Sequence, residues 1–204
     1  MNLNPENINY LFVLIIYISS SIPWAYYIGK VNLDSDIRNF GDKNPGSVNV
    51  FRAGSTVWGL VASVLEISKS GLPIYYAINN SSISNLTMIL FVIVSLVGHG
   101  FSPLLKFKGG KSLAVTAGSW LAITRLEALY TITPSLAILK AIQKNDAITV
   151  TLAFSTLGIY ILFRNPTYFD TQYLLLGIII NLLFIILKHR KEYKNKIVLR
   201  MKIK

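Results

Sequence analysis

The sequence predicts an all-α integral membrane protein, a compact bundle of about seven transmembrane helices with glycine-rich cytoplasmic loops. Its 204 residues are 52% hydrophobic and only 14% charged, and the mean hydropathy is +0.51. The apolar residues form long runs, of the length needed to cross a hydrocarbon core of about 30 Å. A chain of this length has no room for a separate soluble domain, so we expect a single polytopic membrane domain over residues 1–204.

Six apolar runs can be marked, and the fourth is open to two interpretations. The runs cover residues 8–28, 56–78, 86–105, 113–139, 148–163 and 173–187. As one tilted helix, the fourth run makes six spans and puts Arg125 and Glu127 inside the bilayer. As a hairpin of two short helices, 113–125 and 128–139, it makes seven spans and lets both charges reach an interface.

The distribution of Lys and Arg favours seven spans, because basic segments stay in the cytoplasm. With seven spans, one side of the membrane receives four basic segments: residues 29–55, residues 106–111, the turn with Lys140 and Lys144, and the basic tail over residues 188–204. The other side receives almost nothing basic. We therefore expect a multi-pass protein of the cell (plasma or inner) membrane, with the N-terminus outside and the C-terminus cytoplasmic.

The first apolar run, the net charge and the lack of cysteine argue against several classes of protein and of site. The first run has no positively charged segment before it, so we expect it to be retained as a span and not removed as a signal peptide. The net charge of +11 is explained by the cytoplasmic loops and by attraction to anionic headgroups, so nucleic-acid binding is not expected. The absence of cysteine excludes disulfides, thiolate chemistry and Cys-ligated metal sites.

Two glycine-rich loops emerge on the cytoplasmic side and are the places where chemistry can gather. Residues 41–54 combine Gly, Asn and Pro, which favour turns over helix. Residues 98–111 end in Gly109, Gly110 and Lys111. Amides of adjacent glycines can converge on phosphate oxygens, and the lysine supplies a point charge. Each loop alone is compatible with an ordinary solvated connection; together on one face they favour an anion site.

Beyond composition, the loops carry motifs at fixed offsets. They read Ser21-Ile22-Pro23, Gly29-Lys30, Asp36-x-Arg38, Gly41-x-x-Asn44-x-Gly46-x-x-Asn49-x-x-Arg52-x-Gly54, Gly98-His99-x-Phe101-Ser102-Pro103, Phe107-x-Gly109-Gly110-Lys111 and Gly118, with Glu66-x-x-Lys69 and Pro73 in the second run. This pattern resembles the bacterial acyl-phosphate:glycerol-3-phosphate acyltransferase (PlsY) family up to about Gly118 and fades afterwards.

The resemblance implies a membrane enzyme of phospholipid synthesis. Such an enzyme moves a fatty acyl group from acyl phosphate to the sn-1 hydroxyl of glycerol 3-phosphate, giving lysophosphatidic acid and phosphate. Its partners would be these two substrates and membrane lipids, and no cofactor or metal is implied. An acyl phosphate is an activated anhydride, so catalysis needs mainly positioning and stabilisation of the departing phosphate. No Ser-His-Asp arrangement is apparent, which disfavours an acyl-enzyme.

The same resemblance implies the site residues. Lys111 and Arg52 would be catalytic and bind phosphate groups, and His99 would be a base or a donor to phosphate. His99 is equally open to a structural role in ordering its loop, and Asp36 or Asp34 can simply neutralise Arg38. The substrate- and phosphate-binding candidates are Asn44, Gly46, Asn49, Gly109, Gly110, Arg38 and His189.

Three departures from the family pattern bear on activity. The chain has Gly41-Asp42-Lys43-Asn44 where the family usually has Gly-Ser-Gly-Asn, and Val48 has lost a hydroxyl. A carboxylate at Asp42 would repel phosphate unless a neighbour compensates for it. In the C-terminal motif only His189 fits well, and Glu192 stands where an amide is expected.

These departures keep two other functions open. The first alternative is a non-catalytic or transporter-like membrane protein that binds phosphate or anionic lipid without turnover. The second is a structural membrane subunit whose basic tail docks to headgroups or to a partner.

Overall fold

The computed structural model describes residues 5–164, 168–195 and 198–199. Within these residues the chain is helical and has no named β-strand, which confirms the predicted all-α class. Two compact units are present, Met1–Ile123 and Thr124–Lys204. The single domain over residues 1–204 stays a prediction.

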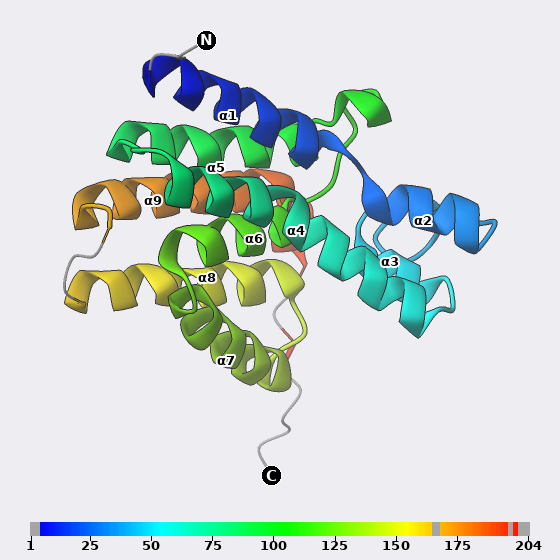
Figure 1. Ribbon diagram of the computed structural model, residues 1–204. Coiled ribbons are helices and arrows are strands. Elements are labelled where there is room, and N and C mark those ends of the chain that lie inside the picture. The colour runs from blue at the N-terminus through cyan, green and yellow to red at the C-terminus, as the bar shows by residue number, and fades with distance from the viewer. Residues whose placement is uncertain (1–4, 165–167, 196–197, 200–204) are drawn as a thin grey trace. The chain divides into compact units, whose positions relative to one another are not determined.

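The first unit contains six α-helices among its described residues, with a 3₁₀ turn η1 (Ile37–Asn39) and another, η2 (Pro103–Leu105). The helices are α1 (Pro5–Ser21), α2 (Trp24–Asn32), α3 (Ser47–Arg52), α4 (Thr56–Asn80), α5 (Asn85–Gly100) and α6 (Leu113–Thr124). Helix α1 packs along α4 and α5, while α2 and α3 pack against α4 near its beginning (Figure 1).

The first apolar run breaks where one continuous helix was expected. Helix α1 ends at Ser21 and α2 begins at Trp24, with Ile22 and Pro23 between them. Proline lacks a backbone N–H and disfavours helical geometry in the residue before it. The break leaves backbone groups of this segment without helical partners, and other parts of the unit supply partners for them, as described below.

Side chains define where the next two helices begin. Ser55 caps α4 by accepting a hydrogen bond from the backbone N–H of Trp58, and Ser84 caps α5 in the same way from Thr87. Such caps satisfy N–H groups that have no partner within the helix. Pro73 lies inside α4, and the helix continues through it to Asn80.

Helix α6 lies against both α4 and α5. The Ser70 hydroxyl of α4 donates to the carbonyl of Val115 at 3.0 Å, and the hydroxyls of Ser95 and Ser119 lie 3.0 Å apart. Gly118 allows the approach to α4, since a Cβ added there would lie 2.0 Å from the carbonyl oxygen of Ile67. The crossing is therefore limited to very small residues.

The second unit consists of α7 (Glu127–Ile142), α8 (Asp146–Phe163), α9 (Thr171–Lys188) and the 3₁₀ turn η3 (Glu192–Lys194). Helix α8 packs against α7, α9 and η3. Asn145 caps α8 by accepting from the backbone N–H groups of Ala147 and Ile148. The Arg164 guanidinium lies 3.3 Å from the carboxylate of Glu127.

The fourth apolar run is divided into α6 and α7. Arg125, with φ of 58°, and Leu126 lie between the two helices. Five described stretches are long and apolar enough to span a membrane: residues 8–32, 56–80, 85–105, 146–163 and 171–188; α6 is a shorter apolar helix. The count of seven crossings stays a prediction, and part of the tail (residues 196–197 and 200–204) lies outside the described residues.

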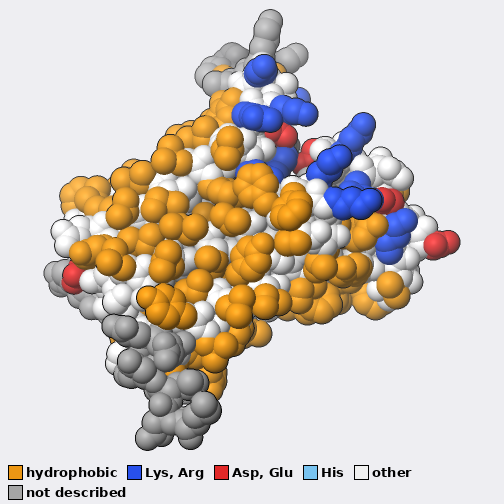
Figure 2. Space-filling model, turned by 90° about the horizontal axis from the view of Figure 1, so that it is seen from above, with side chains coloured by type: hydrophobic (Ala, Val, Ile, Leu, Met, Phe, Trp, Pro, Cys, Tyr) orange, Lys and Arg blue, Asp and Glu red, His pale blue; other side chains and the backbone are white. Residues whose placement is uncertain are grey.

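The surface agrees with a membrane environment. Large apolar side chains such as Leu60, Leu72, Ile159, Leu183 and Phe163 are exposed. Figure 2 shows that hydrophobic side chains dominate the visible surface and that Lys and Arg side chains gather apart from them. A soluble protein rarely exposes such extensive apolar surface. The chain is a multi-pass membrane protein.

Candidate functional site

A cluster of charged and polar side chains forms where the two glycine-rich loops meet. Its members are Lys111, Arg52, Asn49 and Asp42. The Lys111 ammonium lies 2.6 Å from Asp42 Oδ2, and Arg52 Nη1 lies 3.7 Å from Asp42 Oδ1. The Asn49 amide donates to Asp42 Oδ1 at 3.0 Å. Asp42 and Lys111 are 69 positions apart in the sequence. The four residues are called the anion cluster below.

The turn before α3 brings Arg52 and Asn49 to this cluster. Asn49 and Arg52 lie one turn apart on α3, so Arg52 Nη1 can donate to Asn49 Oδ1 at 3.1 Å. Asn49 Nδ2 also donates to the carbonyl of Asn44 at 2.8 Å. Gly41 has φ of 51°, and a Cβ there would lie 2.0 Å from Arg52 Nη1. The positive φ is the reason that glycine is favoured at position 41, and a side chain there would also displace the end of the Arg52 side chain.

The second loop is held against the end of α5. The backbone N–H of Gly110 donates to the carbonyl of His99 at 3.2 Å. A Cβ added at Gly109 would lie 2.0 Å from that carbonyl oxygen, and one at Gly110 would lie 2.3 Å from His99 Nε2. Both glycines are needed for this close approach, which sets the position of Lys111.

A buried ionic cluster lies next to the second loop. Lys69 Nζ is 2.7 Å from Glu66 Oε2 and 2.9 Å from His99 Nδ1, while His99 Nδ1 is 3.3 Å from Glu66 Oε2. Glu66 and Lys69 are buried, with side-chain exposure of 1% each. Buried charges need partners of opposite sign, and here the ammonium and the carboxylate are paired.

The same cluster binds the broken first run. Glu66 Oε1 accepts from the backbone N–H of Ala25 at 2.9 Å, and Lys69 Nζ donates to the carbonyl of Ile22 at 2.6 Å. Nearby, the Ser102 hydroxyl donates to the carbonyl of Ser21 at 2.6 Å. Backbone groups in an apolar environment must find hydrogen-bond partners. The charged pair supplies such partners to the backbone on both sides of the break between α1 and α2.

A cavity of about 80 Å³ connects the two clusters. Glu66 and His99 of the ionic cluster and Lys111 of the anion cluster all line it. The other lining residues are Asn44, Gly46, Ser47, Val48, Ser112, Leu113 and Ala114. The cavity is therefore walled by both glycine-rich loops and by the beginnings of α3 and α6.

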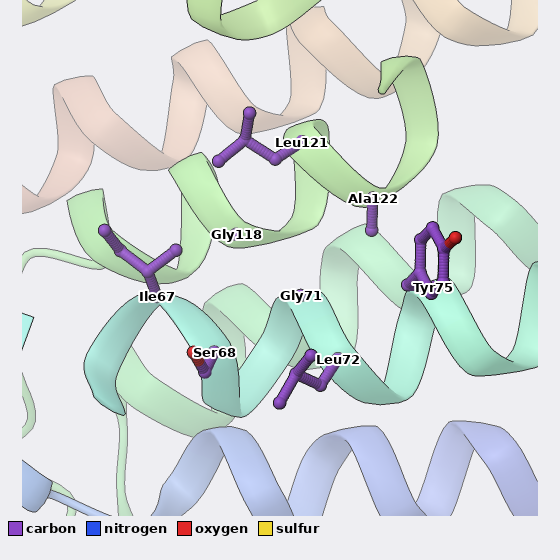
Figure 3. Close-up of a pocket in the computed structure, with 8 residues that line it drawn as sticks. All are labelled: Ile67, Ser68, Gly71, Leu72, Tyr75, Gly118, Leu121 and Ala122. Carbon is purple, nitrogen blue, oxygen red and sulfur yellow. The ribbon is translucent and has the colours of Figure 1, made fainter. Parts of the chain in front are cut away.

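An apolar groove of about 210 Å³ runs between α4 and α6. Its lining residues are Ile67, Ser68, Gly71, Leu72, Tyr75, Gly118, Leu121 and Ala122. Figure 3 shows Gly71 and Gly118 facing each other at the crossing, with Tyr75 and Ala122 at one end of the groove and Ile67 at the other. Ile67 of the groove follows Glu66 of the cavity in α4, and no residue lines both of them.

Electrostatics keep Asp42 ionised. Partial burial raises the pKa of the Asp42 carboxyl, but the hydrogen bond and charge of Lys111 outweigh it and leave the pKa below its usual value. At neutral pH the anion cluster therefore contains one carboxylate between two cations.

Arg38 is bound elsewhere. Arg38 Nη2 lies 2.7 Å from Asp36 Oδ2, and its guanidinium stacks over the Tyr26 ring at 4.6 Å. The hydrogen bond from Arg38 holds the pKa of Asp36 at about 2. These contacts agree with the alternative, left open by the sequence, that Asp36 simply neutralises the charge of Arg38.

His189 and Glu192 belong to the second unit. His189 is buried, and its Nδ1 lies 2.9 Å from the carbonyl of Ile185. The Asn145 amide donates to the carbonyls of Glu192 at 3.2 Å and Asn195 at 3.1 Å, and the hydroxyls of Thr151 and Tyr193 are hydrogen-bonded. The C-terminal motif is thus held by polar residues of α8 and of the turn before it.

Of the predicted site residues, eight are brought together in the first unit. Asn44, Gly46, His99 and Lys111 line the cavity, Asn49 and Arg52 adjoin it through the anion cluster, and Gly109 and Gly110 pack on His99. The sequence did not place Glu66 and Lys69 among the site residues. The signal was present, because two opposite charges three positions apart inside an apolar run are rarely tolerated without a function.

Known proteins resemble this chain over most of its length. The family model described as glycerol-3-phosphate acyltransferase matches residues 10–198. Glycerol-3-phosphate acyltransferase 1 of Thermotoga maritima is 32% identical over 200 residues, covering 92% of this chain and 97% of the relative. The Lactococcus lactis glycerol-3-phosphate acyltransferase is 31% identical over 193 residues, covering 91% and 88%.

The fold also matches solved structures. A crystal structure described as PlsY, an integral membrane glycerol 3-phosphate acyltransferase, in its glycerol 3-phosphate form, superposes with a TM-score of 0.79 at 24% identity, over 91% of this chain and 90% of the other. The lysophosphatidic acid form gives 0.78 at 23%, over 91% and 89%. The resemblance drawn from the loop motifs is confirmed, and the chain belongs to the glycerol-3-phosphate acyltransferase family.

Proposed function

We propose that the chain transfers a fatty acyl group from acyl phosphate to the sn-1 hydroxyl of glycerol 3-phosphate in membrane phospholipid synthesis. The hydroxyl oxygen attacks the acyl carbonyl, the bond from the carbonyl carbon to the phosphate oxygen breaks, and lysophosphatidic acid and phosphate leave. The hydroxyl proton passes to an oxygen of the departing phosphate. The observation that carries the proposal is the anion cluster at the cavity, in a chain of this family.

The anion cluster supplies what this reaction needs. Lys111 and Arg52 neutralise the charge that develops on the leaving phosphate, and the Asn49 amide adds a directed donor. Because the donor is already activated, no nucleophilic side chain and no metal ion are required for the step itself. The cavity walls hold the acceptor hydroxyl near the carbonyl, which is the larger part of the catalysis.

His99 acts as a positioning residue in this proposal. Its Nδ1 lies 2.9 Å from Lys69 Nζ and 3.3 Å from Glu66 Oε2, and its carbonyl accepts from the backbone N–H of Gly110. Through these contacts it links the buried ionic cluster to the loop that carries Lys111. This favours the loop-ordering role over that of a general base.

The apolar groove suits the acyl chain. From Ile67 to Tyr75 it follows eight residue steps of α4, which at about 1.5 Å per step is roughly 12 Å along the helix axis. The lining is almost entirely hydrocarbon. In this proposal the acyl phosphate places its phosphate at the anion cluster and its chain between α4 and α6.

Orientation completes the proposal. The N-terminus lies outside and the C-terminus in the cytoplasm, which follows from the basic loops and tail. Soluble glycerol 3-phosphate then reaches the loops from the cytoplasm, while the acyl donor enters from the bilayer.

Phosphate release tests the reaction directly. The protein is reconstituted in lipid and given palmitoyl phosphate with and without glycerol 3-phosphate. We expect acceptor-dependent release that Lys111→Ala abolishes and Lys108→Ala retains, since Lys108 is an exposed lysine of the same loop. Binding of either substrate without acceptor-dependent release would favour a binding protein, the second candidate, and would sink the enzyme proposal for this substrate pair.

A further inference from the structure

The anion cluster contains an anion of the chain itself. Asp42 Oδ2 lies 2.6 Å from Lys111 Nζ, and Asp42 Oδ1 accepts from Asn49 Nδ2 at 3.0 Å and from the backbone N–H of Asn44 at 3.3 Å. Arg52 Nη1 is 3.7 Å from the same oxygen. Ammonium, guanidinium, amide and backbone N–H groups are the donors that bind phosphate oxygens, and here they converge on one carboxylate.

We propose that Asp42 is an internal occupant of the phosphate site, which an incoming phosphate group must displace, and that it thereby weakens the binding of free phosphate. This inference rests on the proposed function, because that function makes the cluster a phosphate site. A carboxylate and a phosphate dianion repel each other and compete for the same donors, so both cannot hold them at once.

The geometry indicates which partner moves. The side chain of Asp42 is 35% exposed and that of Lys111 only 15%. Asp42 lies in a tight turn, between Gly41 with φ of 51° and Lys43 with φ of 61°. The lysine is fixed by the Gly109–Gly110 approach to His99. The exposed carboxylate therefore swings out to solvent while the cations stay in place.

Displacement costs the same free energy for every phosphate that enters the site, so Asp42 lowers the affinity for acyl phosphate and for inorganic phosphate by the same factor. An acyl phosphate also brings a hydrocarbon chain, whose burial between α4 and α6 keeps its binding favourable. Inorganic phosphate, the product, has no such chain and is left weakly bound. Asp42 thereby speeds the release of phosphate.

A role for Asp42 as general base fits the contacts less well. A carboxylate that accepts from Lys111, Asn49 and Asn44 is stabilised in its ionised form. Such a group has little tendency to take a proton from an alcohol. Its contacts are those of a counter-ion.

The test measures the binding of inorganic phosphate to the full chain in detergent. We expect Asp42→Asn, which removes the charge and keeps the shape, to bind phosphate about tenfold more tightly than the wild type, which corresponds to about 1.4 kcal/mol. Asp42→Ser is a second variant in case the first one folds poorly. Asp34→Asn is the matched control, since Asp34 lies in the same loop and Asn tolerates its φ of 47°; its affinity should stay within about twofold.

Each outcome decides the inference. Tighter binding by both Asp42 variants supports it, and stronger inhibition of turnover by added phosphate in Asp42→Asn supports its kinetic part. Equal or weaker binding by both variants, or no phosphate binding by any protein, overturns it. If the Asp42 variants bind phosphate more tightly but no protein transfers an acyl group, the proposed reaction is wrong and the inference on Asp42 is supported. If acyl transfer occurs and the Asp42 variants bind phosphate as the wild type does, only the inference on Asp42 is wrong.

Discussion

Arg52 and Lys111 are the two cations of the anion cluster, and their side chains serve it differently. The Lys111 ammonium is a compact charge 2.6 Å from Asp42. The Arg52 guanidinium spans two partners, donating to Asn49 and facing Asp42. A planar fork fixes the geometry of its partners, whereas a lysine at this position keeps the charge and loses the fork.

We therefore expect Arg52→Lys to lower kcat/KM for acyl transfer by about tenfold or more, the equivalent of one well-placed hydrogen bond. The measurement is phosphate release at varied acyl phosphate and glycerol 3-phosphate. Arg190→Lys, the same change at an exposed arginine of the second unit, serves as control. An Arg52→Lys enzyme with wild-type kinetics would show that charge alone suffices at position 52.

At the scale of the element, α4 has two functions. On one side its buried Glu66 and Lys69 bind the backbone of the broken first run and His99. On another side its residues from Ile67 to Tyr75 line the apolar groove. A single helix thus fixes the second loop and offers the surface for a hydrocarbon chain.

Removing one partner of the buried pair should destabilise the protein strongly. Lys69→Met leaves the Glu66 carboxylate and the Ile22 carbonyl without this donor, and we expect a loss of roughly 3–5 kcal/mol in the free energy of unfolding. Thermal or denaturant unfolding in detergent measures it. The double variant Glu66→Gln, Lys69→Met should recover part of the loss, because no unpaired charge then remains. Full stability of the single variant would contradict this account.

The groove makes a prediction about chain length. Ser68→Phe places an aromatic ring in the lining of the groove, so kcat/KM for palmitoyl phosphate should fall by about tenfold, as expected for a few buried CH₂ groups lost from the site. Butyryl phosphate should be affected much less. Ser63→Phe, the same change on α4 outside the groove, is the control. Equal losses for both donors would argue against an acyl chain at this place.

At the scale of the whole molecule, orientation in the membrane decides which substrates reach the loops. The chain has no cysteine, so single cysteines can be labelled with a membrane-impermeant maleimide. In intact cells we expect Ser81→Cys and Leu126→Cys to react, and Lys144→Cys and Lys194→Cys to react only after permeabilisation. The cysteine-free parent controls for background. Protection of Leu126→Cys together with external labelling of Lys194→Cys would instead support six spans.

Much of this protein could be predicted from its sequence. Long apolar runs require helices, because in a bilayer each backbone group must be satisfied within its own segment. The spacing of Asn49, Arg52, Gly109, Gly110 and Lys111 predicted the family, which the comparisons confirm. Adjacent glycines before a lysine predicted backbone amides that converge on phosphate oxygens, which stays a prediction; in the structure the Gly110 N–H donates to the His99 carbonyl.

Tertiary structure alone decided the rest. The bounds of the first run depend on Glu66 and Lys69, which lie more than forty positions away and satisfy the backbone that Pro23 interrupts. The partner of Lys111 is Asp42 from the other loop. Periodicity and spacing describe contacts between near neighbours in sequence, whereas ion pairs between distant segments depend on how the helices pack. The sequence therefore determined the helices and the candidate residues, and the packing decided which charges meet.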